Sequence, residues 1–304
     1  MQRIPKPTHG SVGWHAIRHR DLEGKCVLGA SEVSIVMGAN PYENRVDLAI
    51  RKLGTPQVSE PNEAMVRGNV LEPALLQHAI NESDSSFYLP DEMYLNGRII
   101  ATLDGRSRLN EAILLEAKTN NRYALGEDLP LSWIWQAQAQ MYCTDAQQVV
   151  FVILDKHLRI GFHTVSRDTS MIYDMRKAVE VFCEYIDNGC IPDDEPLTVP
   201  QVNTLFPDPS GETDLGSSAI ALINEWGAIK TAIHDLEEQE KACKDALANL
   251  MRDADFGLVD GQRVLSFKSQ QSKRFDHKSL IADHPDLEAK YTTTTSFRVM
   301  RTVR

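Results

Sequence analysis

Two neighbouring stretches decide the fold that we expect for this chain: IIATLDG at residues 99–105 and AILLEAK at residues 112–118. Each begins as an apolar run and meets an acidic residue, Asp104 in the first and Glu116 in the second. Asn-Gly and Asn-Glu pairs precede the two runs, so the pattern predicts two buried strands joined in a hairpin. Because strand faces repeat every two residues, we expect Lys118 on the same face as Glu116, with Asp104 close by.

Two carboxylates and an ammonium on an apolar hairpin need compensation, because burying an unpaired charge is costly. A divalent cation held by Asp104 and Glu116, with Lys118 beside a water molecule or a phosphate, is one such compensation. An ordinary Glu–Lys cross-strand pair at a solvated edge of the sheet is the alternative. This pattern leaves both interpretations open.

The composition is typical of a soluble globular protein with one large domain or two smaller ones. The 304 residues are 42% hydrophobic and 25% charged, which is ample for a core. No apolar stretch approaches the ~20 residues of a membrane span, and the first 13 residues lack the apolar region of a secretory signal. The five cysteines include no C-x-x-C pair, which argues against a disulfide framework or a zinc site and fits a reducing cytoplasm.

The net charge of −11 is distributed unevenly along the chain. Residues 256–304 hold nine Lys/Arg and five Asp/Glu, a net of +4, so the first 255 residues carry −15. This balance argues against indiscriminate nucleic-acid binding by the whole surface. An acidic protein can still bind DNA when its basic groups line one groove or ring, so a DNA-directed function is not excluded.

Helical and strand patterns alternate over the first 190 residues, which predicts an α/β core. Gly68 and Pro73 are expected to break or kink one of the helices. The predicted helices are a short one capped by Ser31 and ending at Gly38, and others over 47–53, 62–81, 132–142 and 168–188, while further strands are expected over 147–154 and 159–165.

A proline-rich stretch, residues 191–216, is the predicted linker between two domains, 1–190 and 217–304. The second domain begins with a heptad stripe, which is typical of a helix packed in its own domain or in a coiled coil. Glu240 occupies the one missing position of the stripe. Its apolar members are Leu222, Trp226, Ile229, Ile233, Leu236, Cys243, Leu247 and Leu250. A basic extension follows, with a hairpin at 259–262, a short helix over 277–283 and a final strand over 294–303.

A third carboxylate, Glu72, stands on an apolar stripe of the predicted helix 62–81. It shares this face with Met65, Leu76 and Ala79. A glutamate there needs a partner, which a salt bridge to Arg67 or a partly exposed turn would supply. Alternatively, Glu72 joins Asp104 and Glu116 around one cation site.

Three polar residues, Ser132, Gln136 and Gln140, form a stripe at i, i+4 and i+8 on the predicted helix 132–142. Such a stripe is usually the solvated face of a helix. It can also place Gln136 next to a water molecule or a phosphate.

Six motifs, taken in order, resemble the YqaJ viral recombinase family, which is typified by the lambda-type phage exonuclease and belongs to the PD-(D/E)XK nuclease superfamily. They are Trp14-His15-Ala16-Ile17-Arg18, Ala30-Ser31-Glu32, Arg67-Gly68-Asn69-x-x-Glu72-Pro73, Leu103-Asp104-Gly105, Glu116-Ala117-Lys118 and Gln136-Ala137-Gln138-Ala139-Gln140-Met141-Tyr142. The match extends over roughly residues 12–165. The tail around Arg274-Phe275-Asp276 also resembles the C-terminal extension of longer phage members. Leu103 stands where the family usually has proline, so the local turn before Asp104 is expected to differ.

The resemblance implies a metal site at the acidic residues. Asp104 and Glu116 would bind Mg²⁺, or Mn²⁺ in its place, with help from the carbonyl of Ala117. Glu72 would be the further acidic residue near a second metal ion.

The resemblance also implies catalytic and DNA-binding residues. Lys118 would orient or deprotonate the attacking water and stabilise the pentavalent phosphorane, and Gln136 would support that site. Arg18 and Ser31 would hold the 5′-phosphate of the strand being degraded. Alternatively, Arg18 only adds general attraction within the basic cluster of residues 18–20.

The expected fold is a PD-(D/E)XK nuclease core, a mixed central sheet flanked by helices, followed by a long helix and a small α+β extension.

The resemblance implies a Mg²⁺-dependent nuclease of phage recombination that resects double-stranded DNA ends 5′ to 3′ for a single-strand annealing protein. It further implies a homo-oligomer, ring-shaped in many family members. We expect no membrane association and a place in the cytoplasm of a bacterial host. An endonuclease with the same site is the close alternative, and a non-catalytic DNA-binding or assembly protein is the alternative of a different class.

Overall fold

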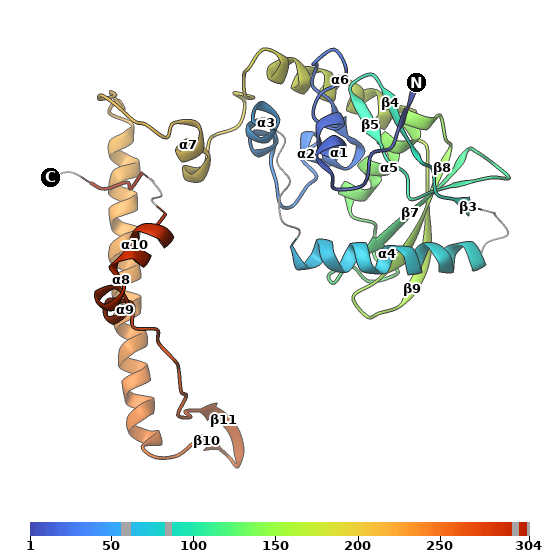
Figure 1. The fold of residues 1–304 in the computed structure, drawn as a ribbon. Coiled ribbons are helices and arrows are strands. Elements are labelled where there is room, and N and C mark those ends of the chain that lie inside the picture. The colour runs from blue at the N-terminus through green and yellow to red at the C-terminus, as the bar shows by residue number, and fades with distance from the viewer. Residues whose placement is uncertain (56–61, 83–86, 294–297, 303–304) are drawn as a thin grey trace. The chain divides into compact units, whose positions relative to one another are not determined.

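The apolar run before Glu116 forms a central strand of a mixed sheet in the computed structural model (Figure 1). Two neighbouring strands of this sheet, β7 and β8, are parallel and the other pairs are antiparallel. The order is β3 (Phe87–Tyr88), β6 (Gly105–Ser107), β7 (Ile113–Thr119), β8 (Gln148–Leu154) and β9 (Ile160–Ser166). The predicted mixed central sheet flanked by helices is therefore confirmed.

The structure describes residues 1–55, 62–82, 87–293 and 298–302. The chain divides into two units, Met1–Leu205 and Phe206–Arg304. In the described part of the chain, every helix is too short or too polar to cross a membrane.

Alternation along β7 directs its side chains to two different helices. Leu115 packs with Leu76 and Ala79 of α4 (Glu63–Glu82), on one face of the sheet. Leu114 belongs instead to the main core, with Trp135 of α5 (Leu131–Thr144). Because strand faces repeat every two residues, even-numbered positions of β7 face the α5 side.

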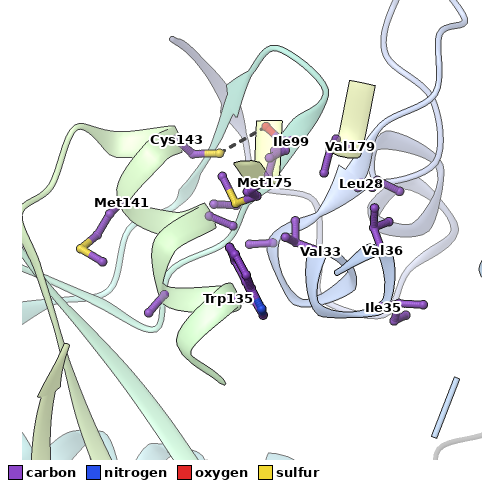
Figure 2. Packing of buried hydrophobic residues seen from close by; sticks show 14 of the residues in the cluster. Leu28, Val33, Ile35, Val36, Ile99, Trp135, Met141, Cys143, Met175 and Val179 are labelled. Carbon is purple, nitrogen blue, oxygen red and sulfur yellow. Dashed lines mark hydrogen bonds between the residues drawn. The ribbon is translucent and has the colours of Figure 1, made fainter. Parts of the chain in front are cut away.

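A second sheet lies on the other side of α5, which contacts strands of both sheets. Its order is β1 (Gln2–Pro5), β4 (Glu92–Asn96), β5 (Ile99–Ala101) and β2 (Leu28–Gly29). Figure 2 shows the core where α5 meets the segments around Leu28, Val33 and Ile99; here the Cys143 thiol donates to the Ile99 carbonyl at 3.3 Å.

Several further helices close this core. They are α1 (Val12–Ile17), the 3₁₀ turn η1 (Ala30–Glu32), α2 (Val33–Val36), α3 (Arg45–Leu53) and α6 (Thr169–Asp187). Asp168 caps α6 by accepting from the backbone amides of Ser170 and Met171. The buried face of α6 includes Met175 and Val179, four residues apart.

The predicted pairing of residues 99–105 with 112–118 is wrong. The Asn96-Gly97 turn pairs β5 with the preceding strand β4, so the first apolar run belongs to the second sheet. The strand beside β7 is β6, where Gly105 lies opposite Leu115. The chain passes between the sheets at residues 102–104, which leaves Asp104 immediately before β6.

Two local predictions also fail. Ser31 is not a helix cap: Gly29 occupies that position before η1, and the Ser31 hydroxyl accepts from Arg18 instead. Helix α4 runs unbroken through Gly68 and Pro73. Pro73 has no N–H to donate to the Asn69 carbonyl one turn earlier. Asn69 and Pro73 are both exposed, so this carbonyl faces water. The other predicted helices and strands of residues 1–190 are confirmed within a few residues.

A helix inside the predicted linker was missed. Helix α7 (Val199–Leu205) packs on α3, and the buried Gln201 amide donates to Asn44 at 3.0 Å and to Asp47 at 2.7 Å. The first unit therefore extends to Leu205, beyond the boundary predicted at residue 190.

The second unit contains the predicted heptad helix, α8 (Ala219–Met251). The predicted hairpin is confirmed as β10 (Phe256–Val259) and β11 (Gln262–Ser266), and the short helix as α9 (His277–Asp283). A further helix, α10 (Pro285–Tyr291), was not predicted. Residues 298–302 form no strand, and the rest of the predicted strand 294–303 lies outside the described residues.

We expect Phe151→Ala to destabilise the first unit by about 3–5 kcal/mol, because Phe151 is fully buried on β8 between the sheet and Trp133. Phe162→Ala on β9 is the matched control, since Phe162 is 46% exposed and should cost about 1 kcal/mol. Urea denaturation followed by tryptophan fluorescence in a Trp226→Phe background reports this unit alone. Equal losses in both variants would contradict the packing.

Candidate active site

A buried carboxylate lies at the centre of the candidate site. Glu116 on β7 is 4% exposed and faces α5. Its Oε1 accepts from Lys118 Nζ at 2.8 Å and from Gln136 Nε2 at 2.6 Å, and its Oε2 accepts from Gln140 Nε2 at 2.6 Å. Four side chains from one strand and one helix therefore form a single hydrogen-bonded cluster.

The two glutamines occupy successive turns of α5, so both reach the same carboxylate. Gln136 also accepts from Lys118 Nζ at 2.9 Å. The predicted polar stripe on this helix thus faces the site rather than solvent. Gln140 belongs to that stripe but was not predicted as a site residue. Its position four residues after Gln136, on the same helix face, could have indicated this role.

Asp104 is held beside this cluster by the backbone. Its Oδ2 accepts from the amide of Ala117 at 2.9 Å. Burial, followed by repulsion from Glu116 and Glu72, raises the pKa of Asp104 well above its ordinary value. The predicted proximity of Asp104 and Glu116 is confirmed, although a different strand pairing produces it.

Glu72 lies close enough to interact with the same carboxylates. Burial and then repulsion from Glu116 raise the pKa of Glu72. It is partly exposed on α4 and, within the described residues, forms no ion pair with Arg67. Its apolar neighbours are only partly as predicted: Leu76 and Ala79 are buried, but Met65 is half exposed.

Arg18 and Ser31 both line a neighbouring cleft. Arg18 Nη2 donates to Ser31 Oγ at 3.2 Å, and its guanidinium lies 4.3 Å from the centre of the Trp14 ring. This cleft measures about 640 Å³. A second cleft, of about 530 Å³, contains Lys118 and Gln136 in its wall. Ser31 and Asn40 line both, so the two clefts adjoin.

The side chains as they stand do not form a finished metal site. In the described part of the chain, no three His, Cys, Asp or Glu side chains are arranged to hold a metal ion. Instead, Lys118 and two amides occupy the oxygens of Glu116. The donor chemistry nevertheless fits a hard divalent cation, because Asp104 and Glu116 offer carboxylate oxygens. A bound cation would also offset the burial and the repulsion from Glu116 and Glu72 that raise the pKa of Asp104.

The comparisons with known proteins agree with the motifs. Residues 13–147 match the YqaJ-like viral recombinase domain, and every predicted site residue falls within this range. The chain is 25% identical over 296 residues, 91% of each sequence, to the uncharacterized protein YqaJ of Bacillus subtilis strain 168. The predicted resemblance is confirmed: residues 13–147 match the model of the YqaJ-like viral recombinase domain.

Solved structures with similarity include an alkaline exonuclease, LHK-Exo, from Laribacter hongkongensis. It is 23% identical, with a TM-score of 0.49 over 59% of this chain and 93% of that one. LHK-Exo in complex with dAMP is 25% identical at the same TM-score and coverage. A phage related exonuclease from Haemophilus somnus 129PT is 14% identical, with a TM-score of 0.43 over 54% of this chain and 95% of that one.

Asp104→Asn should raise the stability of the metal-free protein at neutral pH, because it removes a repelled carboxylate while its amide oxygen still accepts from Ala117. The pKa of Asp104 is higher in the folded state than its ordinary 3.8, so wild-type stability falls as pH rises from 3.8 through the folded value. Below 3.8 both states are protonated and the difference between the two proteins should disappear. Urea midpoints in chelator across this pH range measure the effect.

The exposed Asp91→Asn is the control for that series and should lack the pH-dependent gain. A constant difference between wild type and Asp104→Asn at every pH would contradict a raised pKa of Asp104 in the folded protein.

Proposed function

We propose that this chain is a divalent-metal-dependent deoxyribonuclease of phage recombination that degrades double-stranded DNA from its ends, 5′ to 3′. The single observation that carries the proposal is the Glu116–Lys118–Gln136 cluster beside Asp104, in a cleft that adjoins the Arg18–Ser31 pair. A catalytic cluster next to an anion-binding pair suits cleavage close to a phosphorylated end. The match of residues 13–147 to the YqaJ-like viral recombinase domain supports the same class of substrate.

Asp104, Glu116 and the Ala117 carbonyl are the residues that would hold Mg²⁺ or Mn²⁺, with Glu72 near a second ion. When bound, such an ion neutralises charge developing on the phosphate and makes a water molecule more acidic. Without it, three carboxylates would repel the phosphodiester.

Lys118 acts in this proposal as a charged hydrogen-bond donor. Burial opposes its charge, but Glu116, Asp104 and Glu72 outweigh burial and raise the pKa of Lys118. A lysine ammonium is ordinarily protonated at neutral pH, and in this proposal it orients the attacking water and stabilises phosphoryl oxygens rather than deprotonating the water. Gln136 Oε1 fixes its direction by accepting from Nζ.

Arg18 and Ser31 would bind the terminal 5′-phosphate. Water attacks the next phosphorus, the bond to the 3′-oxygen of the terminal nucleotide breaks, and a 5′-mononucleotide leaves. The shortened strand again carries a 5′-phosphate, so the same pair can bind it in the next cycle. The remaining 3′ single strand is the substrate of a single-strand annealing protein, in the cytoplasm of a bacterial host.

Digestion of linear duplex DNA labelled at one 5′ end, with and without Mg²⁺, tests the proposal. We expect mononucleotide release that requires Mg²⁺, and at least a 100-fold loss of rate in Asp104→Asn and Lys118→Met, a barrier increase of about 2.7 kcal/mol. Glu111→Gln, an exposed carboxylate change near β7, should keep wild-type activity.

Internal fragments, or cleavage of covalently closed circles, would favour an endonuclease with the same site. Absence of cleavage with any divalent cation would leave a non-catalytic DNA-binding or assembly protein.

Self-association through α8 is part of the proposal, because a 33-residue helix needs packing and its apolar stripe is exposed. Leu236, 62% exposed, stands in the middle of the stripe. Glu225 and Lys230 flank it at positions where opposite charges meet between two parallel helices. A second copy of the same helix would cover the stripe.

Sedimentation equilibrium should show an oligomer whose association weakens at least tenfold in Leu236→Asp. Thr231→Asp, outside the stripe on the same helix, is the matched control. A monomeric wild type, or equal effects of the two changes, would contradict self-association through α8.

A further inference from the structure

A buried lysine connects the segments that carry Arg18 and Ser31. Lys52 of α3 is 1% exposed. Its Nζ donates to the Arg18 carbonyl at 2.7 Å, to the Val27 carbonyl at 2.9 Å and to Glu32 Oε2 at 2.8 Å. All three ammonium protons are therefore satisfied, and the backbone of Arg18 is tied to the turn that contains Ser31.

Glu32 completes this connection from the other side. Its Oε2 also accepts from the Gly29 amide at 2.7 Å, and its Oε1 accepts from Arg51. Burial alone would raise the pKa of Glu32, but Lys52, Arg18 and Arg51 outweigh burial and hold it well below the usual range. The carboxylate stays ionised, so it fixes η1 to α3 on both sides of Ser31.

Gly29 leaves the space that the Arg18 side chain occupies. A β-carbon at position 29 would lie 2.1 Å from Arg18 Nη2 and 2.5 Å from Arg18 Cζ. The backbone of Gly29 has φ −64°, which any residue can adopt. The need for glycine is therefore steric: the guanidinium crosses the chain at this point to reach Ser31 Oγ.

We propose that Gly29, Glu32 and Lys52 are positioning residues that hold the Arg18 guanidinium and the Ser31 hydroxyl together as one 5′-phosphate-binding unit. This inference rests on the proposed function. The three residues set the preference for phosphorylated over hydroxyl 5′ ends by acting through Arg18 and Ser31.

A substitution at Gly29 isolates this positioning from the ion pair. In Gly29→Ala the β-carbon displaces the Arg18 side chain, which is flexible enough to move without unfolding the protein. We expect the ratio of the dissociation constants for 5′-hydroxyl and 5′-phosphorylated duplex to fall about tenfold, towards one. Fluorescence anisotropy with Mg²⁺ in a Lys118→Met background, where cleavage is suppressed, measures both constants on the full chain.

Four further variants complete the experiment. Arg18→Met should lose the preference to the same extent, and Gly13→Ala, whose β-carbon meets nothing closer than 3.7 Å, should retain it. Glu32→Gln keeps an acceptor for the Gly29 amide but loses the charge that holds Lys52, so an intermediate loss is expected. Lys52→Met should lose the preference. If this variant does not fold, Glu32→Gln and Gly29→Ala still test the positioning role.

The outcomes separate the two levels of the proposal. If Arg18→Met loses the preference and Gly29→Ala keeps it, the positioning role is overturned while end recognition stands. If the substitutions at Gly29, Glu32 and Lys52 weaken binding to both kinds of end equally, these residues support only the fold, and the inference is overturned. If wild type binds both ends alike, end recognition by Arg18 fails and the inference fails with it.

Discussion

The burial of the Glu116 carboxylate is the constraint on which the rest of the first unit depends. A charge at this depth costs several kcal/mol unless hydrogen bonds and an opposite charge replace water. Lys118 supplies the charge, and Gln136 and Gln140 supply the amide donors. The two glutamine bonds cross from α5 to β7, so the packing of helix against sheet and the assembly of the site are the same event.

The Lys52–Glu32 pair repeats this arrangement near the N-terminus. It joins α3 to the backbone of Arg18, Val27 and Gly29, segments that have little regular structure of their own. A buried ion pair is weak support for overall stability, because desolvation offsets much of its attraction. Its clearer effect is to define one arrangement of the segments it joins, and here that arrangement brings Arg18 to Ser31.

Local sequence patterns correctly predicted the helices and strands whose buried face packs against the same kind of environment along their whole length. The continuous apolar run of β7 and the spacing of buried residues on α6 each reflect a single, uniform packing environment. Predictions failed where a side chain or a strand pairs with a segment that is distant in the sequence. Serine is a preferred helix cap, but the Ser31 hydroxyl accepts a hydrogen bond from the Arg18 side chain. Gly29 occupies the cap position before η1 instead. The apolar run at 99–101 has the pattern of a strand, but its pairing depends on the turn before it and on the second sheet.

The sequence by itself determined the residue types of the candidate site, their order and the alternation that directs Glu116 and Lys118 to one face of β7, because these follow from short-range spacing. It also contained the spacing of Gln136 and Gln140. Only the tertiary structure decided which helix that face meets, that Asp104 reaches Ala117 from the start of β6, and that Gly29 accommodates Arg18. Those relations join segments far apart in the chain, and the free energy that selects them comes from burying charge and apolar surface together, which no local pattern records.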